Sequence, residues 1–226
     1  MNFKRLHPYR FEIFFLSEFL ILFGSIIVSD HLYESVLLPL MFIANIIAGL
    51  VLMSRRKFIF AVFVILLIIS ALLLTYRLNY TKYNTQIAFL QMGINFLFYV
   101  FVTYEIIKQI WYTKKISSSI IFGLISGYIS IGLIGFFSCK AIELAIPGSF
   151  QASQAVYLAS ENLTDSFMYY SYITLLSIGF GDITPVSTLA QKVSVLIGLL
   201  GQMYNVIITA IIVGKYLNQL NNSGEK

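Results

Sequence analysis

The chain has few charged residues for its length, and this scarcity excludes an ordinary soluble domain. Asp, Glu, Lys and Arg make up 11% of its 226 residues, whereas 58% are hydrophobic. The mean hydropathy is +0.84. A soluble domain carries about 25% charged residues. The composition therefore predicts a membrane protein with little mass outside the bilayer, and the net charge of +5 predicts membrane topology rather than a nucleic-acid partner.

Residues suited to redox, metal or nucleophilic chemistry are also scarce. Cys139 is the only cysteine, so an intrachain disulfide is impossible. His7 and His31 are far apart, with no metal-ligand spacing around them. No apolar stretch carries the serine–histidine or paired-aspartate arrangement of an intramembrane protease, and the phosphate-loop and dinucleotide patterns of an ATP-driven pump are absent. We expect no metal site, no cofactor and no enzymatic activity.

Six apolar stretches each reach, or nearly reach, the roughly 20 residues that a bilayer core requires. The first is expected to be a retained helix rather than a signal peptide, because Glu12 and Glu18 interrupt it. Two positions are open for Glu18, one facing the helix bundle and one near the inner membrane interface. The expected spans are Phe11–Val28, Val36–Met53, Phe58–Tyr76, Ile87–Ile107, Ile116–Ala141 and Thr188–Leu217.

Basic residues are concentrated at one end of these spans. This excess marks the cytoplasmic face, so both termini are expected inside a multi-pass protein of the cell membrane, either plasma or bacterial inner membrane. The majority set is Lys4, Arg5, Arg10, Arg55, Arg56, Lys57, Lys108, Lys114, Lys115, Lys215 and Lys226, against Arg77, Lys82, Lys140 and Lys192 on the other face.

One loop, within Tyr169–Pro185, carries the most specific pattern of the chain. A short helix is expected from Thr164 or Asp165 to Leu176, which is too short to cross a bilayer and must turn back. Gly179 and Gly181 follow at alternate positions. Glycine enters positive φ without a Cβ penalty, so this pair suits a backbone that aims successive carbonyls into an ion path. Non-helical backbone at membrane depth is permitted where it lines such a path.

The loop resembles the selectivity-filter signature of the potassium channel superfamily, Thr-x-x-Thr-x-Gly-Tyr-Gly-Asp. Thr174, Ser177, Gly179, Phe180, Gly181 and Asp182 carry the resemblance, with Ser177 in place of threonine and Phe180 in place of tyrosine. The resemblance implies that the carbonyls of Ser177, Ile178, Gly179 and Phe180, with the Ser177 hydroxyl, replace the hydration shell of K⁺. Gly181 would lead the chain out of the filter.

The resemblance also implies that the outer mouth is braced by a hydrogen bond to Asp182. The expected aromatic donor is Tyr170, although plain packing is the alternative role for Tyr169, Tyr170 and Tyr172. In the last span, Gly201 corresponds to the family's hinge glycine, with Gly198 and Gly214 as competitors and helix packing as the alternative role. Asn205, Ile208 and Ile212 follow at helical spacing and are expected to line the inner pore. The family's Pro-x-Pro bend is absent. The residues therefore do not specify whether a gate closes the inner end of the pore.

The expected architecture is an all-α membrane protein with six transmembrane helices and a re-entrant pore helix between the fifth and sixth. Residues 1–115 would form a four-helix domain that resembles a voltage sensor without gating charges. Residues 116–217 would form the pore domain, whose glycines in the fifth span allow close helix contact. Residues 218–226 would form a short tail. No soluble ligand domain is expected on the chain, and one loop per chain predicts a homotetramer in membrane lipids.

The sequence thus predicts a channel that conducts K⁺ passively. Ile87–Ile107 has no basic residue, and a voltage sensor needs charge that moves through the field, so opening is not expected to be steeply voltage-dependent. The alternative is a weakly selective monovalent cation channel, because Ser177 and Phe180 depart from the commonest filter. Permeant K⁺ is the one expected ligand, while the gating stimulus and the conductance are not specified by the residues.

Overall fold

The computed structural model describes residues 6–26, 28, 32–54, 56–79, 85–113, 117–153 and 163–224. These residues are mostly helical, as the sequence predicts, with one two-stranded sheet. The chain divides into two compact units, Met1–Val102 and Thr103–Lys226. His31 and several basic residues used for the orientation lie outside the described residues: Lys4, Arg5, Arg55, Lys82, Lys114, Lys115 and Lys226.

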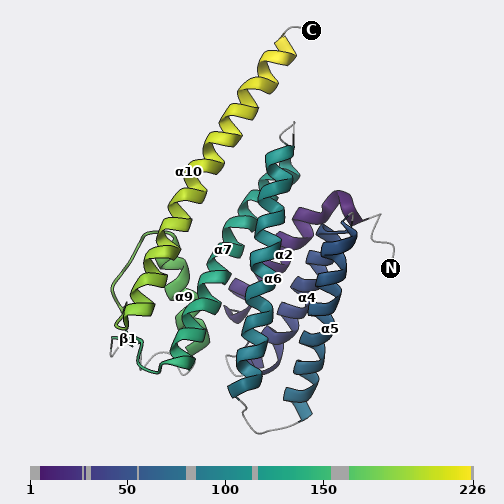
Figure 1. Cartoon of the computed structure of the whole chain (residues 1–226). Helices are drawn as coiled ribbons and strands as arrows, with labels where there is room; N and C mark the ends of the chain where they lie inside the picture. The colour runs from purple at the N-terminus through teal and green to yellow at the C-terminus, as the bar shows by residue number, and fades with distance from the viewer. Residues whose placement is uncertain are drawn as a thin grey trace. The chain divides into compact units, whose positions relative to one another are not determined.

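The first unit consists of helices that run back and forth along one another (Figure 1). Pro39 lies in the first turn of its helix, where the missing N–H has no intrahelical partner to lose. The elements are η1 (His7–Tyr9), α2 (Arg10–Phe23), η2 (Gly24–Ile26), η3 (Tyr33–Leu37), α4 (Leu38–Leu52), α5 (Lys57–Asn79) and α6 (Thr85–Tyr112) as far as Val102.

Aromatic rings form the core of this unit. The ring of Phe98 lies 5.0 Å from that of Phe63 and 6.3 Å from that of Phe14, centroid to centroid. A Cβ on Gly49 would lie 2.7 Å from the Phe98 ring, so this glycine lets α4 approach α6 closely. Glu18 is fully buried in the unit. Of its two expected positions, the structure therefore favours the one that faces the bundle.

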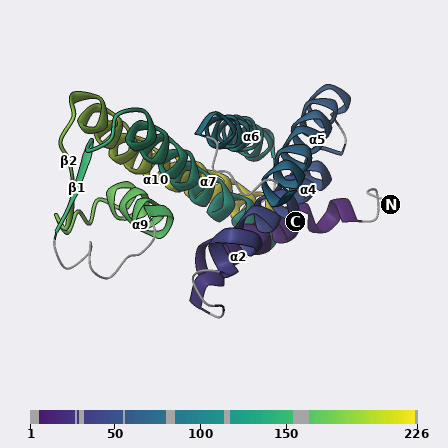
Figure 2. The same cartoon turned by 90° about the horizontal axis from the view of Figure 1, so that it is seen from below.

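The second unit places a short helix against two long ones. It contains α7 (Ser118–Ala145), β1 (Phe150–Ala152), α9 (Leu163–Leu175), β2 (Ile183–Pro185), α10 (Thr188–Gly224) and the end of α6. α9 packs on both α7 and α10, which also pack on each other (Figures 1 and 2). β1 and β2 are antiparallel, with Phe150 opposite Pro185. The segment between α9 and β2 is thus held at both of its ends.

Helix length separates the expected spans into two groups. Among the described residues, α5, α6, α7 and α10 are long and apolar enough to cross a membrane. α2 has 14 residues and α4 has 15, which is shorter than the roughly 20 residues of a simple span. Six transmembrane helices therefore remain a prediction. Beyond Leu217, where the tail is expected to begin, α10 continues as a helix to Gly224.

Candidate functional site

The loop after α9 turns back on the end of its own helix. The N–H of Ser177 donates to the carbonyl of Thr174 (3.0 Å), and that of Ile178 donates to the carbonyl of Ile173 (2.9 Å). These bonds occupy carbonyls that a helix C-terminus otherwise leaves without a partner. In the described part of the chain, no main-chain N–H donates to a carbonyl of residues 177–181. The loop thus keeps its own carbonyl oxygens available for another ligand.

Backbone handedness alternates along this segment. Ser177, Gly179 and Gly181 have φ of 58°, 57° and 78°, whereas Ile178 and Phe180 are not in the positive-φ region. Such alternation turns consecutive carbonyls toward the same side of the chain, as a carbonyl-lined ion path requires. The predicted positive φ of the two glycines is confirmed. The prediction missed Ser177, a non-glycine residue in a conformation that costs about 1–2 kcal/mol.

The side chains of the loop are exposed on the second unit. Phe180 is 69% exposed and Ile178 is 51% exposed. A Cβ added at Gly179 or Gly181 would meet nothing within 4 Å. Two large apolar side chains exposed on one loop indicate an interaction surface.

Tyr169 and Asp182 form a hydrogen-bonded brace at the C-terminal end of the loop. The Tyr169 hydroxyl donates to Oδ2 of Asp182 (2.7 Å), whose Oδ1 accepts the N–H of Ile183 (3.0 Å). The hydrogen bond to Asp182 raises the pKa of Tyr169 above its ordinary value, because it favours the protonated phenol. The bracing carboxylate is therefore where the sequence places it.

The predicted donor of this brace, Tyr170, is wrong by one residue. Its hydroxyl bonds instead to Oγ of Ser194 on α10 (2.6 Å), and its side chain is 4% exposed. Neighbouring residues of a helix point about 100° apart, so Tyr169 faces Asp182 and Tyr170 faces α10. Tyr170 supports the loop by fixing α9 to α10 rather than by holding Asp182.

α7 holds α9 through hydroxyl-to-carbonyl bonds at places where α7 has glycine. Tyr172 donates to the carbonyl of Ile129 (2.7 Å) and Ser171 to that of Gly132 (2.7 Å). A Cβ on Gly132 would overlap the Tyr172 ring, and one on Gly135 would overlap Oγ of Ser171. The predicted close contact at the glycines of this helix is confirmed here, and Thr174 lies in the last turn of the helix so held.

Gly201 brings α10 against the C-terminal end of α9. A Cβ on Gly201 would overlap the carbonyl oxygen of Leu175, whereas one on Gly198 would lie 3.7 Å from the carbonyl oxygen of Thr174. At Gly214 a Cβ would meet nothing within 4 Å. The structure shows the packing role of Gly201, and its hinge role remains a prediction.

The prediction of which α10 residues line an inner pore is partly wrong. Ile208 is 8% exposed and shares a face with Gly201 and Tyr204, whose hydroxyl donates to the carbonyl of Leu124 on α7 (2.6 Å). This face packs within the unit, so Ile208 is not available to a pore. Asn205 is exposed and its Nδ2 donates to the Tyr128 hydroxyl (3.3 Å), and Ile212 is half-buried.

Two polar residues of α10 were missed by the sequence reasoning. Nε2 of Gln202 donates to Oγ of Ser177 (2.7 Å). Nζ of Lys215 donates to the carbonyls of Ile110 (2.7 Å), Trp111 (2.9 Å) and Thr113 (2.7 Å) at the end of α6. A sequence signal existed for both, because polar side chains are costly inside an apolar span and are retained where they bind or face water.

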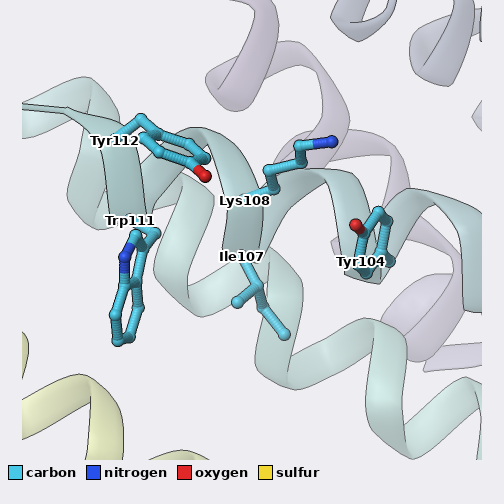
Figure 3. Close-up of a pocket in the computed structure, with 5 residues that line it drawn as sticks. All are labelled: Tyr104, Ile107, Lys108, Trp111 and Tyr112. Carbon is cyan, nitrogen blue, oxygen red and sulfur yellow. The ribbon is translucent and has the colours of Figure 1, made fainter.

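A shallow hollow lies on one side of α6 (Figure 3). Its volume is about 220 Å³, and its lining comes from that single helix. Nζ of Lys108 lies 5.4 Å from the centre of the Tyr104 ring and 4.0 Å from Oε1 of Glu105. Exposed aromatic side chains with a lysine suit the headgroup level of a membrane. Among the described residues, no group of three His, Cys, Asp or Glu could hold a metal ion.

Comparison with known proteins gives one match. A protein-family model described as "Ion channel" matches residues 124–218, which include most of α7, all of α9, the loop and most of α10. The match covers less than half of the chain. Neither the curated proteins nor the solved structures give a match. The family match supports an ion channel, and the apolar helices support a membrane protein.

Proposed function

We propose that this chain is a potassium-selective channel in which the carbonyls of residues 177–181 coordinate the ion. The observation that carries the proposal is the alternation of φ along these residues, together with carbonyls that accept no main-chain hydrogen bond in the described part of the chain. A dehydrated cation needs closely spaced oxygens in place of its water shell. No other cofactor and no enzymatic step are needed for this passive conduction.

Four copies around one axis are the proposed assembly. One chain offers one such loop, whereas an ion path needs a ring of oxygens. The exposed Phe180 and Ile178 side chains support this assembly, because neighbouring copies would cover apolar surface that a single chain leaves open. The remaining apolar helix surface would face membrane lipids, with both termini on the cytoplasmic side.

The orientation of α9 favours a cation beneath the loop. α9 ends at Leu175, directly before the loop, so the partially negative C-terminal end of its dipole lies at the inner end of the proposed path. The Ser177 hydroxyl adds an oxygen at the same place. Asp182 and its bond to Tyr169 would hold the outer end.

Opening is proposed not to be steeply voltage-dependent. Lys108, near the end of α6, is the one basic residue between Thr85 and Tyr112. A sensor needs several charges that cross the field to provide the required free energy. A conductance that rises steeply over tens of millivolts in bilayer recordings would contradict this part of the proposal.

The central experiment measures K⁺ flux from liposomes that contain the purified protein and a K⁺ gradient. Gly179→Ala introduces a side chain at a φ of 57°, which an L-residue rarely adopts, and should abolish barium-sensitive flux. Gly93→Ala is the matched control, since a Cβ there meets nothing within 4 Å. Full flux through the Gly179→Ala protein would show that this loop is not the ion path.

A weakly selective monovalent cation channel is the second candidate. It is favoured by one observation, namely that Ser177 and Phe180 stand where the commonest filter has threonine and tyrosine. The reversal potential in a Na⁺–K⁺ gradient separates the two candidates. A value near zero would support weak selectivity, and a value near the K⁺ equilibrium potential would support the first proposal.

A further inference from the structure

The contact between Gln202 and Ser177 joins the inner helix to the inner end of the loop. Nε2 of Gln202 lies 2.7 Å from Oγ of Ser177. The contact depends on the preceding residue, because any Cβ at Gly201 would overlap the carbonyl oxygen of Leu175 and push α10 away. Asn205, almost one turn further along, donates to Tyr128 rather than to the loop. Among the described side chains of α10, Gln202 is thus the amide that reaches residues 177–181.

Ser177 is the residue of the loop that most needs support. Among the described residues it is the one non-glycine with a positive φ. Such a conformation persists where the surroundings hold it. Its N–H is bound by the carbonyl of Thr174 on one side, and its hydroxyl is bound by Gln202 on the other. These two bonds fix both the backbone and the side chain at the point where an ion would enter from the inside.

We propose that Gln202 is a positioning and specificity-determining residue for a monovalent cation at the inner end of the loop. This inference rests on the proposed function. The Gln202 amide donates to one lone pair of the Ser177 hydroxyl oxygen and leaves the other for the cation.

The chemistry of the neighbouring side chains supports a role for this amide. Gln202 is followed by Met203, which is 56% exposed, and Val206 is 67% exposed. A glutamine among apolar residues of a span is costly unless it faces water or a polar partner. Here the polar partner is Ser177, so the cost is offset at the site where the proposed function needs a fixed oxygen.

The test compares barium block and the Rb⁺/K⁺ flux ratio in liposomes that contain the full chain. Gln202→Met keeps an unbranched side chain but removes the donor. It should weaken barium block about 3- to 10-fold, the change expected for one hydrogen bond, and should shift the Rb⁺/K⁺ ratio. Met203→Leu, at the next exposed position, is the matched control and should leave both readouts unchanged.

Ser177→Gly decides whether Gln202 acts through the hydroxyl. Glycine accepts the φ of 58° without strain but offers no oxygen. In this background Gln202→Met should have no further effect on barium block, since the interaction it removes is already absent. An equal effect of Gln202→Met in both backgrounds, or no effect in either, would overturn the proposal.

A second variant keeps the test decisive if Gln202→Met does not assemble. Gln202→Glu has nearly the same shape but accepts the Ser177 hydrogen and adds negative charge, so internal barium block should become tighter. Unchanged block in Gln202→Glu would also overturn the proposal. The Gly179→Ala variant distinguishes failure of the proposed function from failure of the Gln202 inference. If flux survives in Gly179→Ala, the loop is not the ion path and the proposed function is wrong. If flux is lost in Gly179→Ala, the Gln202 results test only the role of Gln202.

Discussion

Each of the two units is stabilised internally by a different set of interactions. In the first, rings of Phe14, Phe63 and Phe98 pack on one another, and the core is mostly apolar. In the second, hydroxyls donate to main-chain carbonyls across helices, as Tyr172 does to Ile129 and Tyr204 does to Leu124. The burial of apolar surface is non-directional, whereas a hydrogen bond restricts distance and angle. Among the described residues, the unit that carries the loop has more of these hydroxyl-to-carbonyl bonds between elements than the first unit, in which Tyr33 donates to Ile21.

Phe98→Ala should have the largest effect on stability. Phe98 is 1% exposed, and removing a buried aromatic ring costs about 3–5 kcal/mol of unfolding free energy. The ion selectivity of the folded protein should stay unchanged, because no loop contact is lost. Thermal unfolding in detergent, together with the reversal potential, checks both statements. Phe101→Ala, at a 43% exposed position of the same helix, should lower the free energy of unfolding much less. An equal loss of stability in both variants would contradict the role of the buried rings in the first unit.

Gly132→Ala should have the next largest effect, and it should alter conduction as well. The new methyl group would overlap the Tyr172 ring and strain its bond to Ile129. Overpacking of this kind costs about 1–3 kcal/mol of unfolding free energy. Gly93→Ala, where a Cβ meets nothing within 4 Å, should instead stabilise α6 by about 0.5–1 kcal/mol. Reduced flux with Gly132→Ala but not with Phe98→Ala would sharpen the comparison, and the reverse order would break it.

Lys215→Met should have a smaller effect. It removes an ammonium group that bonds three carbonyls at the end of α6, and the loss of charged hydrogen bonds at a partly exposed site should cost about 1–2 kcal/mol of unfolding free energy. Lys192→Met, at an exposed position of the same helix, is the control. Equal unfolding temperatures for the two variants would show that these bonds add nothing to the second unit.

Tyr169→Phe should have the smallest effect on the free energy of unfolding, but it should change the behaviour of the loop during conduction. It removes the bond to Asp182, so K⁺ currents should decay faster at low external K⁺. Because the pKa of Tyr169 is raised, the bond is present below the ordinary tyrosine pKa and is lost as pH rises through the higher value. The natural protein should therefore acquire the decay of the variant at strongly alkaline pH only. A pH dependence that is the same in Tyr169→Phe would contradict this assignment.

Most of the helices and the character of the loop follow from local patterns. Long apolar stretches predict α5, α6, α7 and α10, and the Gly179–Gly181 spacing predicts positive φ. The donor to Asp182 was placed at Tyr170 instead of Tyr169 because the one-residue register of a helix against a loop depends on how that helix is rotated by its neighbours. The error at Ile208 has the same origin, since the packing of Tyr204 on α7 sets which face of α10 is buried.

Residue type and spacing alone determine that this chain avoids water, that it contains a short helix before an alternating loop, and that glycines permit the loop's conformation. The tertiary structure alone decides which tyrosine holds Asp182, that Ser177 joins the glycines at positive φ, and that Gln202 reaches it. The physical reason is the distance along the sequence over which each interaction acts. Backbone conformation is governed by each residue and its neighbours. The hydrogen bond between Ser177 and Gln202 instead requires α10 to pack against the end of α9 with one rotation and one position along its axis.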